Sequence, residues 1–97
     1  MRTLGEIKKI IGSEKQKLAI AFHVKAIGIF GSYVRDEQHS ESDIDILVDM
    51  DDGVTLFDLI ELQFHLEEIL AQKVDVVMRD GLKPRIASRI LDEVMYC

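Results

Sequence analysis

Two short apolar runs, separated by one long amphipathic stretch, most constrain the fold of this 97-residue chain. Residues 44–48 (Ile-Asp-Ile-Leu-Val) and 74–78 (Val-Asp-Val-Val-Met) have the length and the β-branched content of buried strands. Between them, apolar residues recur at helical spacing over residues 55–70, with Thr55 as the N-cap. A helix of that length can form a right-handed crossover, which makes the two strands parallel neighbours. Their amino-terminal ends are therefore expected to lie side by side.

The rest of the chain supplies one further strand and three further helices. Residues 4–22 predict an amphipathic helix, interrupted near Gly12-Ser13, and residues 26–30 predict a short buried strand that ends at Gly31. A short helix follows Gly31, and Pro84 can occupy the first turn of a last helix. The order α-β-(short α)-β-α-β-α predicts the α/β (α+β) class, as a small three-stranded mixed sheet with helices packed on it.

Three carboxylates fall at the edge where these strands are predicted to begin. Asp43 and Asp45 are two residues apart, so their side chains point to one face of an extended segment, and Asp75 starts the third strand. Three carboxylates within about 5 Å would repel by roughly 3 kcal/mol per pair at an effective dielectric of about 20, and a divalent cation removes that cost. Oxygen ligands suit Mg²⁺ or Mn²⁺, and two such ions about 3.5–4 Å apart commonly support in-line nucleotidyl transfer. Taken alone, Asp43 and Asp45 also fit a solvated strand edge, and Asp75 fits an ordinary strand start.

The segment after residues 26–30 has the composition of a phosphate-binding turn. If this strand pairs antiparallel with residues 44–48, Gly31 and Ser32 arrive at the edge that holds the carboxylates. A glycine lets backbone N–H groups approach a phosphate closely, Ser32 can donate its hydroxyl, and Arg35 falls on the same side of the turn. Taken alone, Gly31-Ser32 also fits a strand-to-helix turn with a serine cap.

Together these motifs resemble the signature of the DNA polymerase β-like nucleotidyltransferase superfamily, in particular its small MNT type. The matching residues are Gly31-Ser32-Tyr33-Val34-Arg35-Asp36, a five-residue spacer, Ser42-Asp43-Ile44-Asp45, and Asp75. The resemblance implies the nucleotidyltransferase fold, with Asp43, Asp45 and Asp75 as catalytic ligands of two Mg²⁺ ions and Asp75 as the activator of the attacking hydroxyl. It also implies nucleoside triphosphate binding by Gly31, Ser32, Arg35 and Ser42, although Ser42 also fits a turn cap.

By the same resemblance, the expected activity is Mg²⁺-dependent transfer of a nucleoside monophosphate, AMP from ATP, to an acceptor hydroxyl. Minimal domains of this type act as antitoxins with a separate helical HEPN partner, and they can add AMP to a tyrosine of that toxin. The alternative is a non-catalytic antitoxin that neutralises its partner by forming a complex. Asp36 favours this alternative, because it replaces the family's glycine and adds negative charge near the phosphates. A third hypothesis is a catalytic subunit of a small-molecule transferase.

Composition narrows the partners and the compartment. The formal charge of −6 gives little electrostatic support for nucleic acid as a sole partner or for a membrane surface. The single cysteine, Cys97, excludes an intrachain disulfide, and charges in the first turns fit neither a signal peptide nor a membrane span, so we expect a cytoplasmic protein. The histidines are scattered and no P-loop motif occurs, which argues against a zinc site and a P-loop hydrolase. Without a linker or a repeat, residues 1–97 are predicted to form a single nucleotidyltransferase domain.

Overall fold

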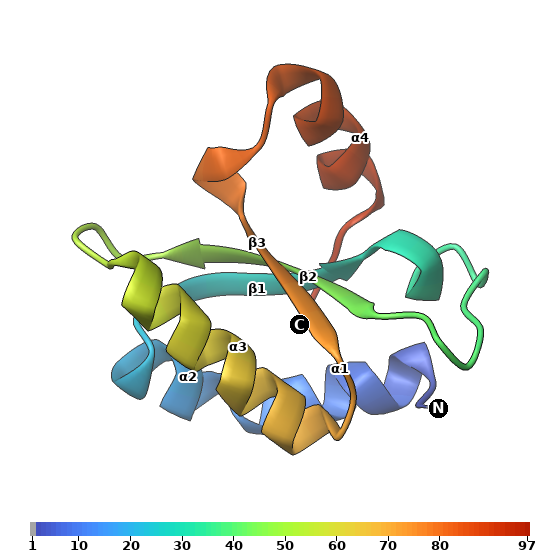
Figure 1. Cartoon of the computed structure of the whole chain (residues 1–97), viewed down its shortest axis with the longest axis horizontal. Helices are drawn as coiled ribbons and strands as arrows, with labels where there is room; N and C mark the ends of the chain where they lie inside the picture. The colour runs from blue at the N-terminus through green and yellow to red at the C-terminus, as the bar shows by residue number, and fades with distance from the viewer. Residues whose placement is uncertain (1) are drawn as a thin grey trace.

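The computed structural model describes residues 2–97, and its centre is a four-stranded mixed sheet in the order β3-β2-β1-β4. Helices α1, α2 and α3 lie together on one face of the sheet, and α4 stands on the other (Figure 1). Side chains of β2 alternate between the two faces. Ile46 belongs to the large core beneath the three helices, whereas Leu47 belongs to a small cluster with Ile90 of α4. The sheet therefore has two apolar faces of unequal size.

The four strands confirm the predicted directions of pairing and add one strand. They are β1 (Val24–Phe30), β2 (Ile44–Met50), β3 (Val74–Met78) and β4 (Met95–Tyr96). β1 is antiparallel to β2, and β2 is parallel to β3. The predicted three-stranded sheet is wrong by one strand, because β4 pairs with Gly28 and Ile29 of β1. β4 has only two residues, both exposed, so it carries no apolar periodicity that would reveal a strand in the sequence.

The helices begin and end close to the predicted positions. They are α1 (Leu4–Ser13), α2 (Lys15–Ala21), α3 (Leu56–Leu70) and α4 (Pro84–Glu93), with 3-10 turns η1 (Gly31–Tyr33) and η2 (Arg79–Gly81). The amphipathic stretch over residues 4–22 forms two helices that meet at Glu14, next to the predicted interruption. α3 begins at a capping box in which Thr55 and Asp58 each satisfy the other's backbone N–H. Within residues 2–97, none of the helices is long and apolar enough to cross a membrane.

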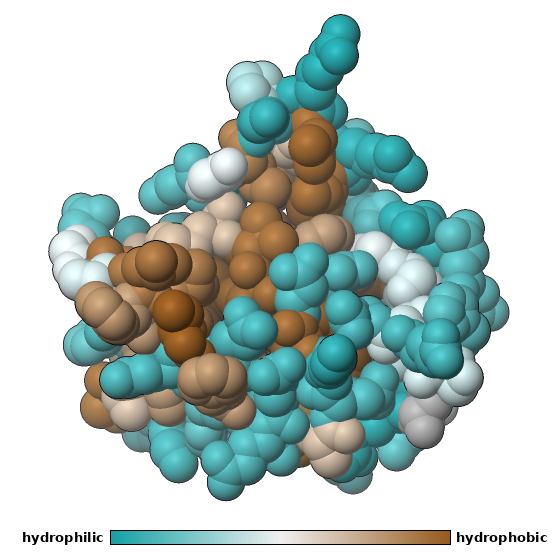
Figure 2. All heavy atoms as spheres, viewed as in Figure 1, coloured by the Kyte–Doolittle hydropathy of each residue, from teal (hydrophilic) through white to brown (hydrophobic). Residues whose placement is uncertain are grey.

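α3 connects β2 to β3 and holds the two strands as parallel neighbours. Its Leu62, Leu66 and Leu70 are completely buried in the large core. Its first half differs, because Leu56 and Phe57 are 69% and 78% exposed. Figure 2 shows apolar residues gathered over this end of α3. Part of the apolar stripe that the sequence places on this helix is therefore surface.

Gly28 is the position at which the attachment of β4 can be tested. An added Cβ would lie 2.6 Å from Val94 Cγ2 and 3.1 Å from the Met95 carbonyl oxygen. We expect Gly28→Ala to push the C-terminal segment away from β1 and to lower the free energy of unfolding by about 1–3 kcal/mol, measured by urea denaturation. The control is Gly12→Ala in α1, where a Cβ would meet nothing within 4 Å. That variant should gain about 0.5–1 kcal/mol, and an equal loss in both would contradict the prediction.

Candidate active site

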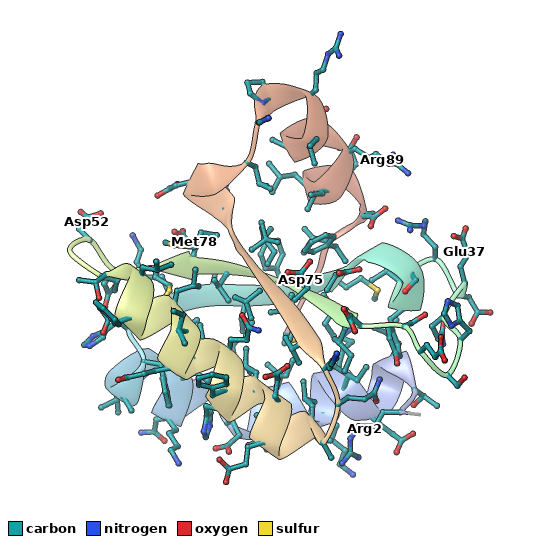
Figure 3. The ribbon with its side chains drawn as sticks, viewed as in Figure 1. Arg2, Glu37, Asp52, Asp75, Met78 and Arg89 are labelled. Atoms are coloured by element: carbon teal, nitrogen blue, oxygen red, sulfur yellow. The ribbon has the colours of Figure 1, made fainter. Side chains whose placement is uncertain are left out.

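The predicted carboxylates lie at one edge of the sheet. Asp45 of β2 is in register with Asp75 of β3 on one side and with Phe30 of β1 on the other. Asp43 directly precedes β2, two residues before Asp45. Figure 3 shows Asp75 on β3 near the middle of the molecule, whereas Asp52 lies far out in the turn after β2. The prediction that the starts of β2 and β3 lie side by side is confirmed for Asp45 and Asp75.

Asp45 carries the electrostatic cost of this arrangement. Its side chain is partly buried, and its pKa is raised to about 6. The largest cause is the loss of hydration around the carboxylate, followed by repulsion from Asp75 and then Asp43. Asp45 is therefore the carboxylate whose charge most needs a compensating cation.

The carboxylate oxygens of Asp43, Asp45 and Asp75 suit a hard divalent cation, but their side chains do not point at one common position. Within residues 2–97, no three Asp, Glu, His or Cys side chains lie close enough together to hold a metal as they stand. Asp43 and Asp75 are exposed and Asp45 is half-buried, so Asp43 and Asp75 have room to turn. A cation would have to draw the three carboxylates together, and their mutual repulsion around Asp45 would favour its binding.

Gly31 lies where the carboxylate edge meets the turn of residues 31–35, the phosphate turn, which takes its name from the role that the sequence predicts for it. Its φ of +82° lies in the left-handed region. A Cβ on this residue would lie 2.9 Å from Asp45 Cγ and closer still to Asp45 Oδ2. Backbone conformation and close approach each require glycine here. The turn η1 that starts at Gly31 therefore lies directly against Asp45, as the predicted antiparallel pairing of the two strands requires.

Arg35 and the Gly31 N–H already have an anionic partner, Glu93 at the end of α4. The Gly31 N–H donates to Glu93 Oε2 at 2.5 Å, and Arg35 Nη1 donates to Glu93 Oε1 at 3.0 Å. Arg35 Nε also donates to Glu37 Oε2 at 3.3 Å. The hydrogen bond to Glu93, and then that to Glu37, raises the pKa of Arg35. The two donors predicted to hold phosphate are thus close together and engaged by a carboxylate.

The remaining predicted residues divide between this site and its surroundings. Ser32 lies within η1, next to Gly31. Ser42 Oγ instead accepts the His39 N–H at 2.9 Å, which is the turn-capping role that the sequence left open. Asp36 adopts a left-handed φ of 58° and is exposed, so the position where the family has glycine does require left-handed backbone.

A cavity of about 250 Å³ lies between the carboxylate edge and α4. It is lined by Phe30, Gly31, Arg35, Asp45, Ile86, Arg89, Ile90 and Glu93. This volume is below the about 300–1,000 Å³ of typical ligand pockets, so it has room for a phosphate chain while the rest of a nucleotide extends over open surface. Sequence reasoning missed Arg89 and Glu93, because no motif marks them. The available signal was the amphipathic pattern of α4, which predicts a packed face with charged residues at its margins.

A mixed sheet that presents carboxylates beside a glycine-led turn is the arrangement that the sequence predicts for a nucleotidyltransferase. The chain belongs to the nucleotidyltransferase domain family, whose profile matches residues 5–97. The family resemblance and the fold predicted from the sequence are thereby confirmed.

Three known proteins are similar over most of the chain. The protein adenylyltransferase MntA of Thermococcus cleftensis is 47% identical over 96 residues, which are 99% of this chain and 97% of MntA. The solved structure of a proposed minimal nucleotidyltransferase has a TM-score of 0.76 and 31% identity, and the match covers 92% of this chain and 93% of that one. A toxin–antitoxin structure with AMP-PNP has a TM-score of 0.71 and 27% identity, and the match covers 87% of this chain and 69% of that one.

The raised pKa of Asp45 predicts a pH-dependent stability in the metal-free protein. Its folded-state pKa is about 6, and a carboxyl in an unfolded chain has a pKa of about 3.9. The native state therefore keeps the Asp45 proton to a higher pH than the unfolded chain does. The resulting contribution to the free energy of unfolding is fully present below about pH 4 and is lost as the pH rises through about 6. In EDTA, we expect Asp45→Asn to be more stable than the wild type above pH 6, by about 1 kcal/mol once solvent screening is allowed for.

The measurement is urea denaturation between pH 4 and pH 8, with the advantage of Asp45→Asn shrinking toward pH 4. Asp52→Asn, which removes an exposed carboxylate in the turn after β2, serves as the control and should show no such trend. An advantage of Asp45→Asn that is the same at every pH would contradict the prediction.

Proposed function

We propose that this protein is a Mg²⁺-dependent adenylyltransferase that moves AMP from ATP to an acceptor hydroxyl and releases pyrophosphate. The observation that carries the proposal is the position of Asp45, which is in register with Asp75 on one side and in close approach to Gly31 on the other. Asp45, a proposed metal ligand, shares one cavity with the proposed phosphate donors Gly31 and Arg35, and in-line transfer requires the two kinds of group to be adjacent. The similarity to MntA of Thermococcus cleftensis supports AMP as the group transferred.

Asp43, Asp45 and Asp75 are the residues that would hold the metal, as two Mg²⁺ ions or Mn²⁺ in their place. Such ions neutralise the charge that develops on the transferring phosphoryl group and its leaving group. Asp75, which is exposed, would also accept the proton of the attacking hydroxyl, the role that the family resemblance implies. The Gly31 N–H, the Ser32 hydroxyl and Arg35 would bind the triphosphate. Ser42 would act indirectly: it caps the turn at residues 39–42 and so holds the segment that leads into Asp43.

The acceptor that we propose is a tyrosine of a helical HEPN-type toxin, with this protein as its antitoxin. The MNT-type motifs support this partner, and so does the similarity to a toxin–antitoxin structure with AMP-PNP. Residues 1–97 would form a single domain that holds the transfer site. The pair would act in the cytoplasm, and neither a membrane nor nucleic acid is needed as a partner of this chain.

Transfer of label from α-labelled ATP tests the catalytic assignment. The acceptor is a purified HEPN-type toxin, in Mg²⁺ buffer. We expect the wild type to label it and Asp43→Ala to reduce the rate by at least about a hundredfold, because a lost metal ligand removes several kcal/mol of transition-state stabilisation. Asp52→Ala removes a carboxylate far from the site and should keep wild-type activity. Labelling that survives in Asp43→Ala would disprove the assignment, and labelling that survives replacement of the partner's tyrosines by phenylalanine would disprove the acceptor.

The second candidate is an antitoxin that works by binding alone. It is favoured by Asp36, whose carboxylate occupies the family's glycine position with left-handed backbone beside the phosphate turn. Co-expression with the toxin separates the two functions. If enzymatic transfer neutralises the toxin, Asp43→Ala should fail to restore growth while Asp52→Ala restores it. Full protection by Asp43→Ala would instead support neutralisation by complex formation.

A further inference from the structure

Glu93 makes the most unusual contact of the site. It is the last residue of α4, and it reaches a turn 62 residues earlier in the chain. Its Oε2 accepts the Gly31 N–H at 2.5 Å and Arg35 Nη1 at 3.1 Å, while Oε1 accepts the same Arg35 nitrogen at 3.0 Å. The Glu93 side chain is only 18% exposed. Both carboxylate oxygens are thus committed to the phosphate turn.

These two donors are the ones that a phosphate would use. A backbone N–H at a glycine turn and an arginine guanidinium are typical ligands of phosphate oxygens, and both bind carboxylates with the same geometry. A phosphate oxygen that accepts from the Gly31 N–H would occupy the position of Glu93 Oε2. Two anions cannot share this N–H, so Glu93 and a triphosphate are mutually exclusive ligands of the turn.

We propose that Glu93 is an internal competitor of the nucleotide: its carboxylate occupies the phosphate turn in the free protein, and a triphosphate binds only when Glu93 leaves. That the displacing anion is a nucleoside triphosphate rests on the proposed function, whereas the competition rests on the contacts of Glu93 alone. Glu93 thereby sets the affinity of the site, because the free energy of its two contacts is subtracted from that of every incoming triphosphate.

The fold gives Glu93 room to move and a second partner. Val94, the next residue, packs against Ile90 and Gly28 and keeps the end of the helix in place. Glu93 therefore leaves the turn by rotation of its own side chain. Arg89 lines the same cavity one helical turn before Glu93, and it forms no ion pair within residues 2–97. Figure 3 shows Arg89 on the side of α4 that faces the turn after β1. A released Glu93 carboxylate can pair with Arg89 at i, i−4 spacing on the helix surface.

Binding of sodium tripolyphosphate without metal, measured by calorimetry, tests the competition directly. We expect Glu93→Gln to bind about tenfold more tightly than the wild type, the equivalent of one charge-assisted contact that no longer has to be broken. Glu93→Ala should show the same direction. Asp92→Asn removes an equal charge from the neighbouring exposed position of α4 and should bind like the wild type.

The amide resonance of Gly31 supplies a second readout that does not depend on activity. In the wild type, the bond to Glu93 should place this proton well downfield. Glu93→Gln should move it upfield, and tripolyphosphate should shift it in both proteins while the remaining spectrum reports an intact fold. Affinity that is unchanged or weaker in both Glu93 variants, or no binding at all, would overturn the inference, since a Glu93 that merely positions Arg35 predicts weaker binding.

The same variants separate this inference from the proposed function. If tripolyphosphate binds more tightly to Glu93→Gln but no AMP reaches any acceptor, the competition stands and the transferase assignment fails. If AMP is transferred but the Glu93 variants bind tripolyphosphate no more tightly than the wild type, the transferase assignment stands and the proposed competition by Glu93 fails.

Discussion

The parallel pairing of β2 with β3 is the constraint on which the rest of the site depends. α3 makes this pairing, because its buried leucines tie the helix to one face of the sheet and return the chain in the same direction. The register then sets Asp45 opposite Asp75. Side chains alternate along a strand, so a slip of one residue would send Asp75 to the face covered by α3 and leave Asp45 alone. The apolar core thus decides where the polar site can form.

The close approach of Gly31 to Asp45 is the second condition. β1 ends next to Asp45, and the turn that follows has no space for a side chain at Gly31. This proximity places Asp45 in one cavity with Gly31 and Arg35. It also withdraws Asp45 from water and raises its pKa, which costs stability when no cation is bound. Under the proposed function, a cation would offset the charge of Asp45 and a triphosphate would bind the turn. In the free protein, Glu93 is the anion that Arg35 binds.

Much of the fold and of the candidate site is predictable from short sequence patterns, because strand length, helix capping and residue spacing depend on neighbouring residues. The apolar run over residues 44–48 is long enough for one buried strand, and Thr55 marks the start of α3 through its capping box. The carboxylates and Gly31 were identified by spacing and by resemblance to a family. β4 and the capping role of Ser42 are harder to predict. A two-residue strand has no apolar period, and a serine in a turn has the same sequence pattern whether it caps the turn or binds a nucleotide. Glu93 was missed entirely, since an acidic residue in an amphipathic helix is ordinary until the helix is placed.

The sequence by itself determined the order of the elements from β1 to α4, the direction of the first three strands and the residues that carry the family signature. These follow from periodicity, capping and crossover geometry, which act within short stretches of chain or within one βαβ unit. Only the tertiary structure decided that α4 covers the carboxylate edge and that Glu93 reaches Gly31 and Arg35. The reason is that α4 is held against the opposite face of the sheet by Ile90, Phe30 and Leu47, residues from three separate elements whose contact no local pattern encodes.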